Sequence, residues 1–223
     1  MKILSFTFNP YSEHCYVACS GELCVIIDPG CLGTEQTGEL LAALMREKLT
    51  PAAILLTHAH FDHIYGVQAL EDRFGLPVYL GRGEESVLDL NEEICSFSGM
   101  PRPQTGWSWK SVSDQDVLDF GGELRFEVIA TPGHTPGGVS YYCREAQVIF
   151  SGDTLFAGSI GRTDLPGGDY DKEIVSIMEK LIWLDGGTLI CPGHGPQSTI
   201  ARERMTNPFL EPFNEREEMP EFP

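Results

Sequence analysis

The chain has 223 residues, of which 42% are hydrophobic, and this is enough to build one sizeable buried core. Its formal net charge of −18 disfavours nucleic acid as a partner, because phosphate binding needs a positive surface. No apolar run approaches the roughly 18 residues of a membrane span. We therefore expect a globular domain that binds a small molecule, with no membrane or nucleic-acid partner and an oligomeric state that the sequence does not indicate.

The expected compartment is the cytoplasm. Residues 1–8 alternate like a first strand and lack the small-residue cleavage pattern of a secretory signal. Seven cysteines, an odd number without a Cys-x-x-Cys pair, argue against a disulfide framework. Cys15, Cys19 and Cys24 are therefore interpreted as small buried hydrophobic residues.

The first half of the chain is predicted to form a meander of strands that continues into alternating helices and strands. Strands are expected at 3–8, 15–19, 23–28, 53–56 and 78–80. Helices are expected at 35–48, where Leu40, Leu44 and Met45 have helical spacing, at 64–74 and near 84–90.

Residues 91–110 have little periodicity and separate this half from a similar second half, which begins near Val117. Strands are expected there at 124–130, 139–143, 148–150 and 188–191, with helices at 172–183 and 199–205. A single domain over residues 1–209 and an acidic, proline-rich tail over 210–223 are predicted.

The segment from Thr57 to His63 places four metal-ligand side chains within six residues, directly after a short apolar strand. Imidazole and carboxylate are ligands of zinc and of non-haem iron. His58 and His60 project alike from an extended backbone, whereas Asp62 and His63 lie past the turn. The spacing therefore predicts two ligand groups, one for each of two metal ions.

Three more potential ligands follow other predicted strands. His134 and His194 lie in Pro-Gly turns, which fix a sharp change of direction at little steric cost. Asp153 follows the strand at 148–150. Four strand ends that each finish on a potential ligand predict one metal site at a common sheet edge.

These motifs resemble the metallo-β-lactamase superfamily. The order His-x-His-x-Asp-His, then a His in Thr-Pro-Gly-His-Thr, an Asp in Ser-Gly-Asp-Thr and a His in Pro-Gly-His-Gly runs from about Ile3 to Phe209. Residues 150–168 and the closing segment after Cys191 resemble the single-domain, glyoxalase II-like (hydroxyacylglutathione hydrolase-like) members. The resemblance implies an α+β fold, the four-layer αββα sandwich, with the site in the cleft between the sheets.

The resemblance also implies a role for each ligand. The first metal ion would be bound by His58, His60 and His134, the second by Asp62, His63 and His194, with Asp153 bridging the two. Zinc is the expected metal, with iron or manganese as alternatives. A hydroxide shared by the two ions would attack the carbonyl carbon of a thioester, for example an S-acylglutathione, or of a related ester, and Asp62 would orient it and accept its proton.

Residues that contact the substrate are less sharply indicated. Arg162 is a candidate for binding a substrate carboxylate, and pairing with Asp164 is the alternative. Trp107 and Trp109 are candidates for a lid over an apolar acyl group, or for an ordinary cover between the two halves. His14, the remaining histidine, is expected to have a hydrogen-bonding structural role.

Other activities of the superfamily give alternatives to thioester hydrolysis. A mononuclear iron persulfide dioxygenase would use His58, His134 and Asp153, and it resembles this chain in the segment Gly161-Arg162-Thr163-Asp164. A lactonase is a second alternative. A diiron electron-transfer member is disfavoured because such relatives have Glu in place of His60, and seven available ligands favour the dinuclear hydrolase.

Overall fold

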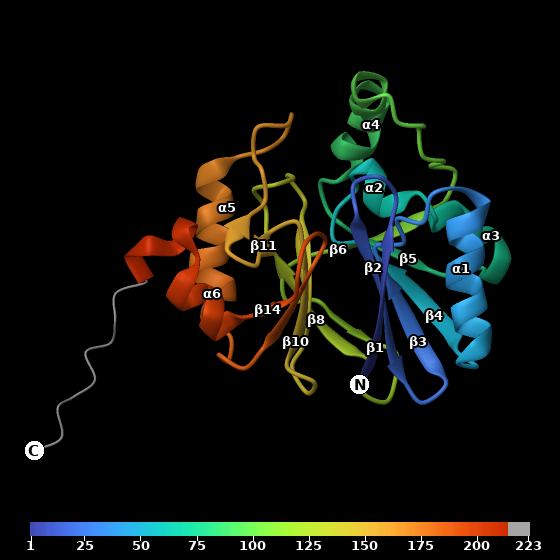
Figure 1. Cartoon of the computed structure of the whole chain (residues 1–223), viewed down its shortest axis with the longest axis horizontal. Coiled ribbons are helices and arrows are strands. Elements are labelled where there is room, and N and C mark those ends of the chain that lie inside the picture. Colours follow the sequence, from blue (N-terminus) through green and yellow to red (C-terminus); the bar gives the residue numbers. More distant parts are fainter. Residues whose placement is uncertain (214–223) are drawn as a thin grey trace, which may run out of the picture.

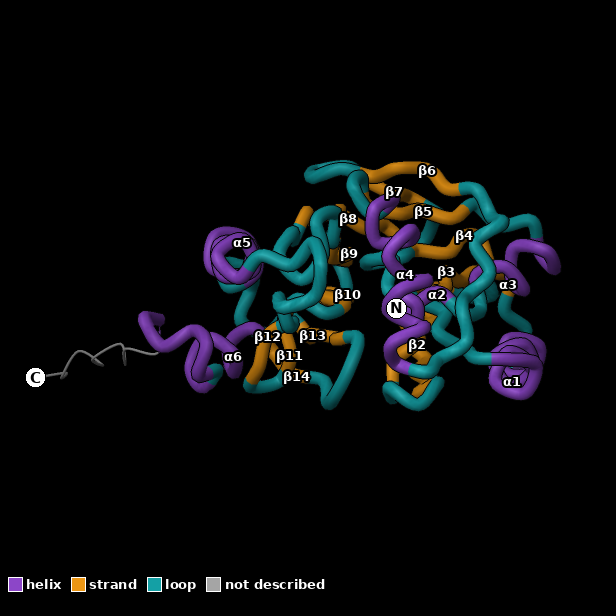
Figure 2. Tube along the Cα trace, turned by 90° about the horizontal axis from the view of Figure 1, so that it is seen from above, coloured by secondary structure: helices purple, strands orange, loops and turns teal. Residues whose placement is uncertain are grey.

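The computed structural model describes residues 1–213 and has the architecture that the resemblance implies. Two β-sheets stand face to face, and helices cover the outer side of each (Figure 1). Seen from above in Figure 2, α1 (Gly33–Arg46) and α3 (Val67–Phe74) flank one sheet, and α5 (Tyr170–Ser176) and α6 (Ile200–Thr206) flank the other. The expected four-layer αββα sandwich is confirmed.

The first sheet has six strands in the order β1-β2-β3-β4-β5-β6. The first three pair antiparallel and the remaining neighbours pair parallel, as expected when helices connect β3 to β4 and β4 to β5. Its strands are β1 (Lys2–Phe8), β2 (Glu13–Ser20), β3 (Leu23–Ile27), β4 (Thr50–Leu55), β5 (Val78–Gly81) and β6 (Trp109–Val112).

The second sheet also has six strands, in the order β14-β13-β10-β9-β8-β7. Four of them form an antiparallel meander, and β13 then joins β10 in parallel after α5 crosses the outer face. Its strands are β7 (Val117–Asp119), β8 (Arg125–Ala130), β9 (Val139–Cys143), β10 (Val148–Gly152), β13 (Leu189–Pro192) and β14 (Ser198–Thr199). A small hairpin of β11 (Leu155–Phe156) and β12 (Ser159–Ile160) lies beside it.

Alternation along the strands sorts the apolar side chains into three layers. In β10, Phe150 packs between the sheets while Ile149 packs under the outer helices, because successive side chains leave opposite faces. Ile27 and Ile26 of β3 divide in the same way, the first between the sheets and the second under α1. Both faces of each sheet are thus buried by apolar packing. A functional site that solvent and substrate can reach is therefore expected at the edge where the two sheets meet.

Two predicted helices differ from those observed. The helix expected at 64–74 is divided into α2 (Phe61–Ile64) and α3, because Gly66 packs against Cys31 so closely that a β-carbon would collide with its sulfur. The helix expected near 84–90 continues to Ser98 as α4 (Glu85–Ser98) and ends at Gly99 in a left-handed conformation. Polar Asn91 stands on its buried stripe, which hides the helical pattern in the sequence.

The folded domain also extends past residue 209, where the sequence predicted that it would end. A turn of 3₁₀-helix covers Pro208–Phe213, and Leu210, placed in the predicted tail, is fully buried under the second sheet. The rest of that tail, 214–223, lies outside the described residues. Over residues 1–213, none of the helices has the length and apolar character needed to cross a membrane.

Candidate metal centre

The predicted ligands follow four strands that end at the same edge of the sandwich. β4 leads into the loop of His58 and His60, β8 into that of His134, β10 into Asp153 and β13 into His194. Gly152 allows the two sheets to meet here: its φ is 51°, and a β-carbon would collide with the Thr57 side chain of the opposite sheet. The strand ends therefore bring together residues that are far apart in the sequence.

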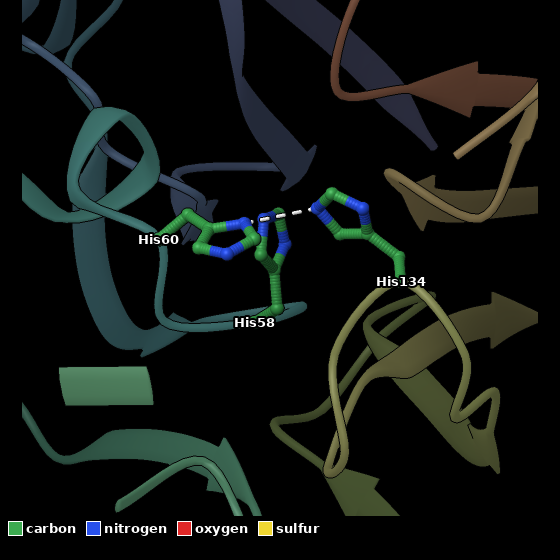
Figure 3. Close-up of side chains that lie close together, drawn as sticks. All are labelled: His58, His60 and His134. Carbon is green, nitrogen blue, oxygen red and sulfur yellow. Dashed lines mark hydrogen bonds between the residues drawn. The ribbon is translucent and has the colours of Figure 1, made fainter. Parts of the chain in front are cut away.

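The first ligand group consists of His58, His60 and His134. Figure 3 shows the three imidazole rings facing one another, His134 from the second half of the chain and the others from the first. Nδ1 of His60 lies 2.9 Å from Nε2 of His134, and the ring centroids are 4.7 to 4.9 Å apart. All three side chains are buried.

The second ligand group consists of Asp62, His63 and His194, and Asp153 lies between the two groups. One ligand atom from each residue of this group lies within 4.8 Å of the others. Asp153 Oδ1 is 3.4 Å from Nε2 of His63, and Oδ2 is 3.5 Å from Nε2 of His194 and 3.6 Å from Nε2 of His134. This carboxylate contacts both groups, which is the position that the resemblance implies for a bridging ligand.

Hydrogen bonds at Nδ1 hold four of the rings so that Nε2 points into the cluster. Oδ2 of Asp28 holds His63 at 3.2 Å, and Oγ1 of Thr57 holds His58 at 3.1 Å. The carbonyl oxygens of Arg162 and Tyr11 hold His134 and His194 at 2.7 and 3.1 Å. Such partners fix the ring orientation and the tautomer of metal-binding histidines.

The donor set fits metal ions. Nε2 of His58, Nε2 of His63 and Oδ1 of Asp153 are buried and have no hydrogen-bond partner. Leaving such atoms unsatisfied inside a protein costs about 1–3 kcal/mol each. Their convergence is explained if each is a ligand atom, with imidazole and carboxylate suited to zinc, iron or manganese.

Electrostatics favour the ligating forms of His58, His60 and the two carboxylates. Burial lowers the pKa of His58 well below its usual range and that of His60 to about 3, so both imidazoles are neutral. Burial opposes ionisation of Asp62 and Asp153, but the charges of His63 and His194, with hydrogen bonding to these rings, together outweigh it and lower the pKa of each carboxyl. Against the effect of burial, the same carboxylates raise the pKa of His63 and His194, so metal ions would displace protons from these two imidazoles.

A buried carboxylate that the sequence analysis did not identify joins the two loops of the first group. Glu84, at the start of α4, accepts hydrogen bonds from the backbone N–H of Ala59 at 2.7 Å and of Gly137 at 2.8 Å. Asn91 donates to the carbonyl oxygen of Ala59 at 2.8 Å, so the peptide between His58 and His60 is held from both sides. Burial raises the pKa of Glu84 to about 7.

Glu173 and Asp28 are two further residues that hold the ligand loops. Glu173, from α5, accepts from the backbone N–H of His134 at 2.8 Å, and burial raises its pKa to about 8. Asp28 accepts from the backbone N–H and the hydroxyl of Thr57 at 2.7 and 2.6 Å. Asp28 follows β3 and lies next to a Pro-Gly turn, a strand-end signal like that of His134 and His194, although those residues follow the turn and Asp28 precedes it. The sequence offered no comparable signal for Glu173 or Glu84.

Of the three residues predicted to contact the substrate, one lines a cavity beside the ligands and two do not. Arg162 lines a cavity beside the ligands, and its guanidinium forms two hydrogen bonds of 2.8 Å to Asp164. Trp107 is buried in the core under the first sheet and Trp109 packs against that core from β6, so neither lines the cavity. Instead, Ile94 of α4 supplies the cavity wall from residues 91–110.

His14 lies at the second group without contacting the cavity. Its Nε2 is 2.8 Å from the carbonyl oxygen of Gly195, its backbone N–H donates to Gly193, and its Nδ1 is 3.1 Å from Thr7 Oγ1. These contacts hold the turn that carries His194, in agreement with the hydrogen-bonding role expected for His14.

Curated proteins similar to this chain include named metallohydrolases. The probable metallo-hydrolase YqgX of Bacillus subtilis (strain 168) is 39% identical over 220 residues, which cover 96% of this chain and 100% of YqgX. The hydroxyacylglutathione hydrolase GloC of Haemophilus influenzae is 33% identical over 94% of this chain and 98% of its own length.

Several solved structures also superpose closely on this chain. The B3 metallo-beta-lactamase BLEG-1 superposes with a TM-score of 0.86 at 41% identity, covering 94% of this chain and 99% of its own. TTHA1623 in a di-iron-bound form has a TM-score of 0.82 at 39% identity, covering 93% and 100%. ETHE1 from Myxococcus xanthus has a TM-score of 0.76 at 26% identity, covering 96% and 91%.

A family profile also matches most of the length of this chain. The profile described as the metallo-beta-lactamase superfamily matches residues 8–194, a stretch that contains all seven ligands. The ligand cluster suggests two metal ions, and a di-iron form is known for one similar structure. With the profile match, the curated relatives and the shared fold, this chain belongs to the metallo-beta-lactamase superfamily.

Proposed function

We propose that the protein is a dinuclear metal-dependent hydrolase that cleaves a thioester or a related ester. The observation that carries this proposal is the pair of three-residue ligand groups that share Asp153. Two bound divalent ions would supply a nucleophile by lowering the pKa of a shared water, and would polarise the carbonyl under attack.

The protein's own residues supply the remaining functions. Asp62 lines the adjoining cavity and its lowered pKa keeps it ionised, so its carboxylate can orient the attacking water and receive the proton that this water loses. Phe61 and Phe156 stand beside the ligands in the same cavity and give it apolar walls. The hydrogen bonds at Nδ1 of His58, His63, His134 and His194 keep these groups in place while a substrate enters and leaves.

An iron-dependent persulfide dioxygenase is the second candidate. Similarity to ETHE1 and the shared Gly-Arg-Thr-Asp segment favour it. It would need His58, His134 and Asp153 alone, and it leaves the convergence of Asp62, His63 and His194 unexplained. This convergence is the reason that we place the hydrolase first.

Metal analysis of anaerobically purified, untagged protein separates the two candidates. We expect two equivalents of zinc, of iron or of manganese, or a mixture that sums to two, together with hydrolysis of thioesters, lactones or other esters. One equivalent of iron, with oxygen uptake on glutathione persulfide and no hydrolysis, would establish the dioxygenase instead.

The cysteines support a reducing compartment for this activity. All seven are buried and none is in a disulfide. Free thiols are usual in the cytoplasm and uncommon in oxidising compartments. We therefore propose a cytoplasmic location, and a fluorescent fusion with fractionation tests it.

A further inference from the structure

A cavity of about 340 Å³ opens directly over the ligand cluster. Its floor is formed by ligands of both groups: His60, Asp62, His134, Asp153 and His194. The volume is at the lower end of the range for small-molecule sites, about 300–1,000 Å³. It is also more than twice the roughly 150 Å³ that holds a benzene ring in an apolar protein cavity.

The walls of this cavity are apolar and come from both halves of the chain. Phe61 and Ile94 stand on one side, and Phe156, Ile160 and Leu165 on the other. Tyr11 also lines the cavity, with its ring against Phe61 at a centroid distance of 5.1 Å. A substrate whose carbonyl carbon lies at the ligands must therefore place its neighbouring group against aliphatic and aromatic carbon.

The cavity offers little to an anionic group apart from the metal ions. Among the residues that line it in the described part of the chain, Arg162 is the single Lys or Arg. Both of its hydrogen bonds to Asp164 would have to be broken or shared before it could bind a second carboxylate. Asp62 and Asp153 on the floor add negative charge. A carboxylate in the acyl group would thus lose its hydration without gaining a free cation.

We propose that this cavity selects an uncharged apolar acyl group of medium length, in preference to short, hydroxylated or carboxylated acyl groups. The proposal rests on the proposed hydrolase function and adds the substrate class to it. The leaving thiol or alcohol then extends through the open side of the cavity, so its identity matters less than that of the acyl group.

A thioester series with one neutral thiol tests the acyl preference. Acetyl, butanoyl, hexanoyl, lactoyl and succinyl thioesters of N-acetylcysteamine would be compared by kcat/KM on the metal-loaded enzyme. Burial of each added methylene contributes about 0.8 kcal/mol of binding free energy. The value of kcat/KM should therefore rise about fourfold per methylene until the cavity is filled. Lactoyl or succinyl thioesters that match or exceed the hexanoyl thioester would overturn the proposal.

A charge placed in the cavity wall tests the same idea from the protein side. Ile94→Lys adds a cation to the wall, where the lining carboxylates are the candidate metal ligands Asp62 and Asp153, and we expect the ratio of succinyl to hexanoyl kcat/KM to rise at least tenfold. Phe97→Lys is the matched control: Phe97 is one turn further along α4 and 95% exposed, and it does not line the cavity. Equal shifts in both variants, each with two metal ions retained, would refute the assignment of the wall.

A binding measurement separates this proposal from the proposed function. Calorimetry with acetate and hexanoate reports the cavity even if no thioester is cleaved. Hexanoate should bind at least tenfold more tightly, and this preference should disappear in Ile94→Lys but not in Phe97→Lys. Equal binding of the two acids overturns the acyl cavity, whereas tight hexanoate binding without any ester hydrolysis overturns only the hydrolase.

Discussion

The two ligand groups differ in how one of their histidines is held and in how far they are buried. Around the first group, Glu84 and Asn91 hold the Ala59 peptide, and Glu173 holds the backbone of His134. Around the second, Asp28 holds the His63 ring and Asn9 holds the Asp62 carbonyl. His194 is held by the main-chain carbonyl of Tyr11 and through the turn that His14 contacts. His194 is also 25% exposed, whereas the rings of the first group are almost fully buried.

This difference indicates a division of labour between the two groups. A ligand set whose rings are almost fully buried keeps its geometry when the metal ion leaves, so it binds metal tightly. A set with a partly exposed ring exchanges water and substrate more readily. We therefore expect the first group to bind metal more tightly than the second, and the following changes test this expectation in order of expected effect.

Asp153→Ala should have the largest effect because it removes the one carboxylate in contact with both groups. We expect loss of both metal ions, or of turnover, with kcat reduced at least about 10³-fold for a loss of several kcal/mol. Metal content by mass spectrometry, together with the hydrolysis rate, checks this. Normal metal content and a normal rate would rule out the shared ligand.

Glu84→Gln should weaken the first group alone. Glutamine has a single acceptor oxygen, so one of the backbone N–H groups of Ala59 and Gly137 would face the amide nitrogen. Changes in such supporting partners typically lower metal affinity about 10–100-fold. Metal titration with cobalt as a spectroscopic probe should show one site weakened and the other unchanged.

Glu203→Gln is the matched control for that substitution. Glu203 is equally buried and accepts from the backbone N–H of Gly158 and the side chain of Asn207, and neither it nor these partners belongs to a ligand group. It should lower the unfolding temperature without a site-specific loss of metal. If both variants weaken both sites alike, Glu84 acts through global stability and the division of labour is wrong.

His14→Ala should leave the metal stoichiometry at two under saturating metal. It removes the side-chain contact to the Gly195 carbonyl, and a typical hydrogen bond contributes about 1 kcal/mol, so the affinity of the second group should fall roughly fivefold. Competition with a chelator measures the two affinities separately. Loss of a metal ion at saturation would show that His14 is itself a ligand.

Glu173→Gln should change the pH dependence of stability of the metal-free protein. Burial raises the pKa of Glu173 to about 8 from about 4.3 in an unfolded chain, so between these values the native state binds more protons than the unfolded state. Its contribution to stability is therefore present at low pH and lost as pH rises through 8. Melting temperatures from pH 5 to 9 should fall less steeply in the variant, and parallel curves would contradict this.

The sequence pattern was sufficient to predict the strand ends that carry the ligands, whereas the four-layer fold was implied by the resemblance to the metallo-β-lactamase superfamily. Each predicted ligand follows an apolar run with strand-like length, and side chains at strand ends of a layered α/β protein meet at one edge. His58 to His63, His134, Asp153 and His194 were identified in this way, and the structure brings them together.

The supporting residues were less visible because their function depends on tertiary contacts. Glu84 precedes Glu85 and reads as part of a solvated helix start, yet its side chain is fully buried. Trp107 and Trp109 lie in a segment without periodicity, which made a lid one of the two interpretations. Trp107 is instead buried in the core, and Trp109 belongs to β6. The sequence pattern indicates which residues alternate along a strand or a helix, but it does not indicate which loops pack against one another.

Helix α4 carries residues that serve two purposes at once. Asn91 holds the peptide between His58 and His60, and Ile94, three residues later, lines the cavity where we place the acyl group. A rigid helix cannot move one without the other. Substitutions that enlarge or shrink the cavity by shifting α4 are therefore expected to alter metal affinity as well, so substrate range and metal preference should diverge together among proteins with this helix.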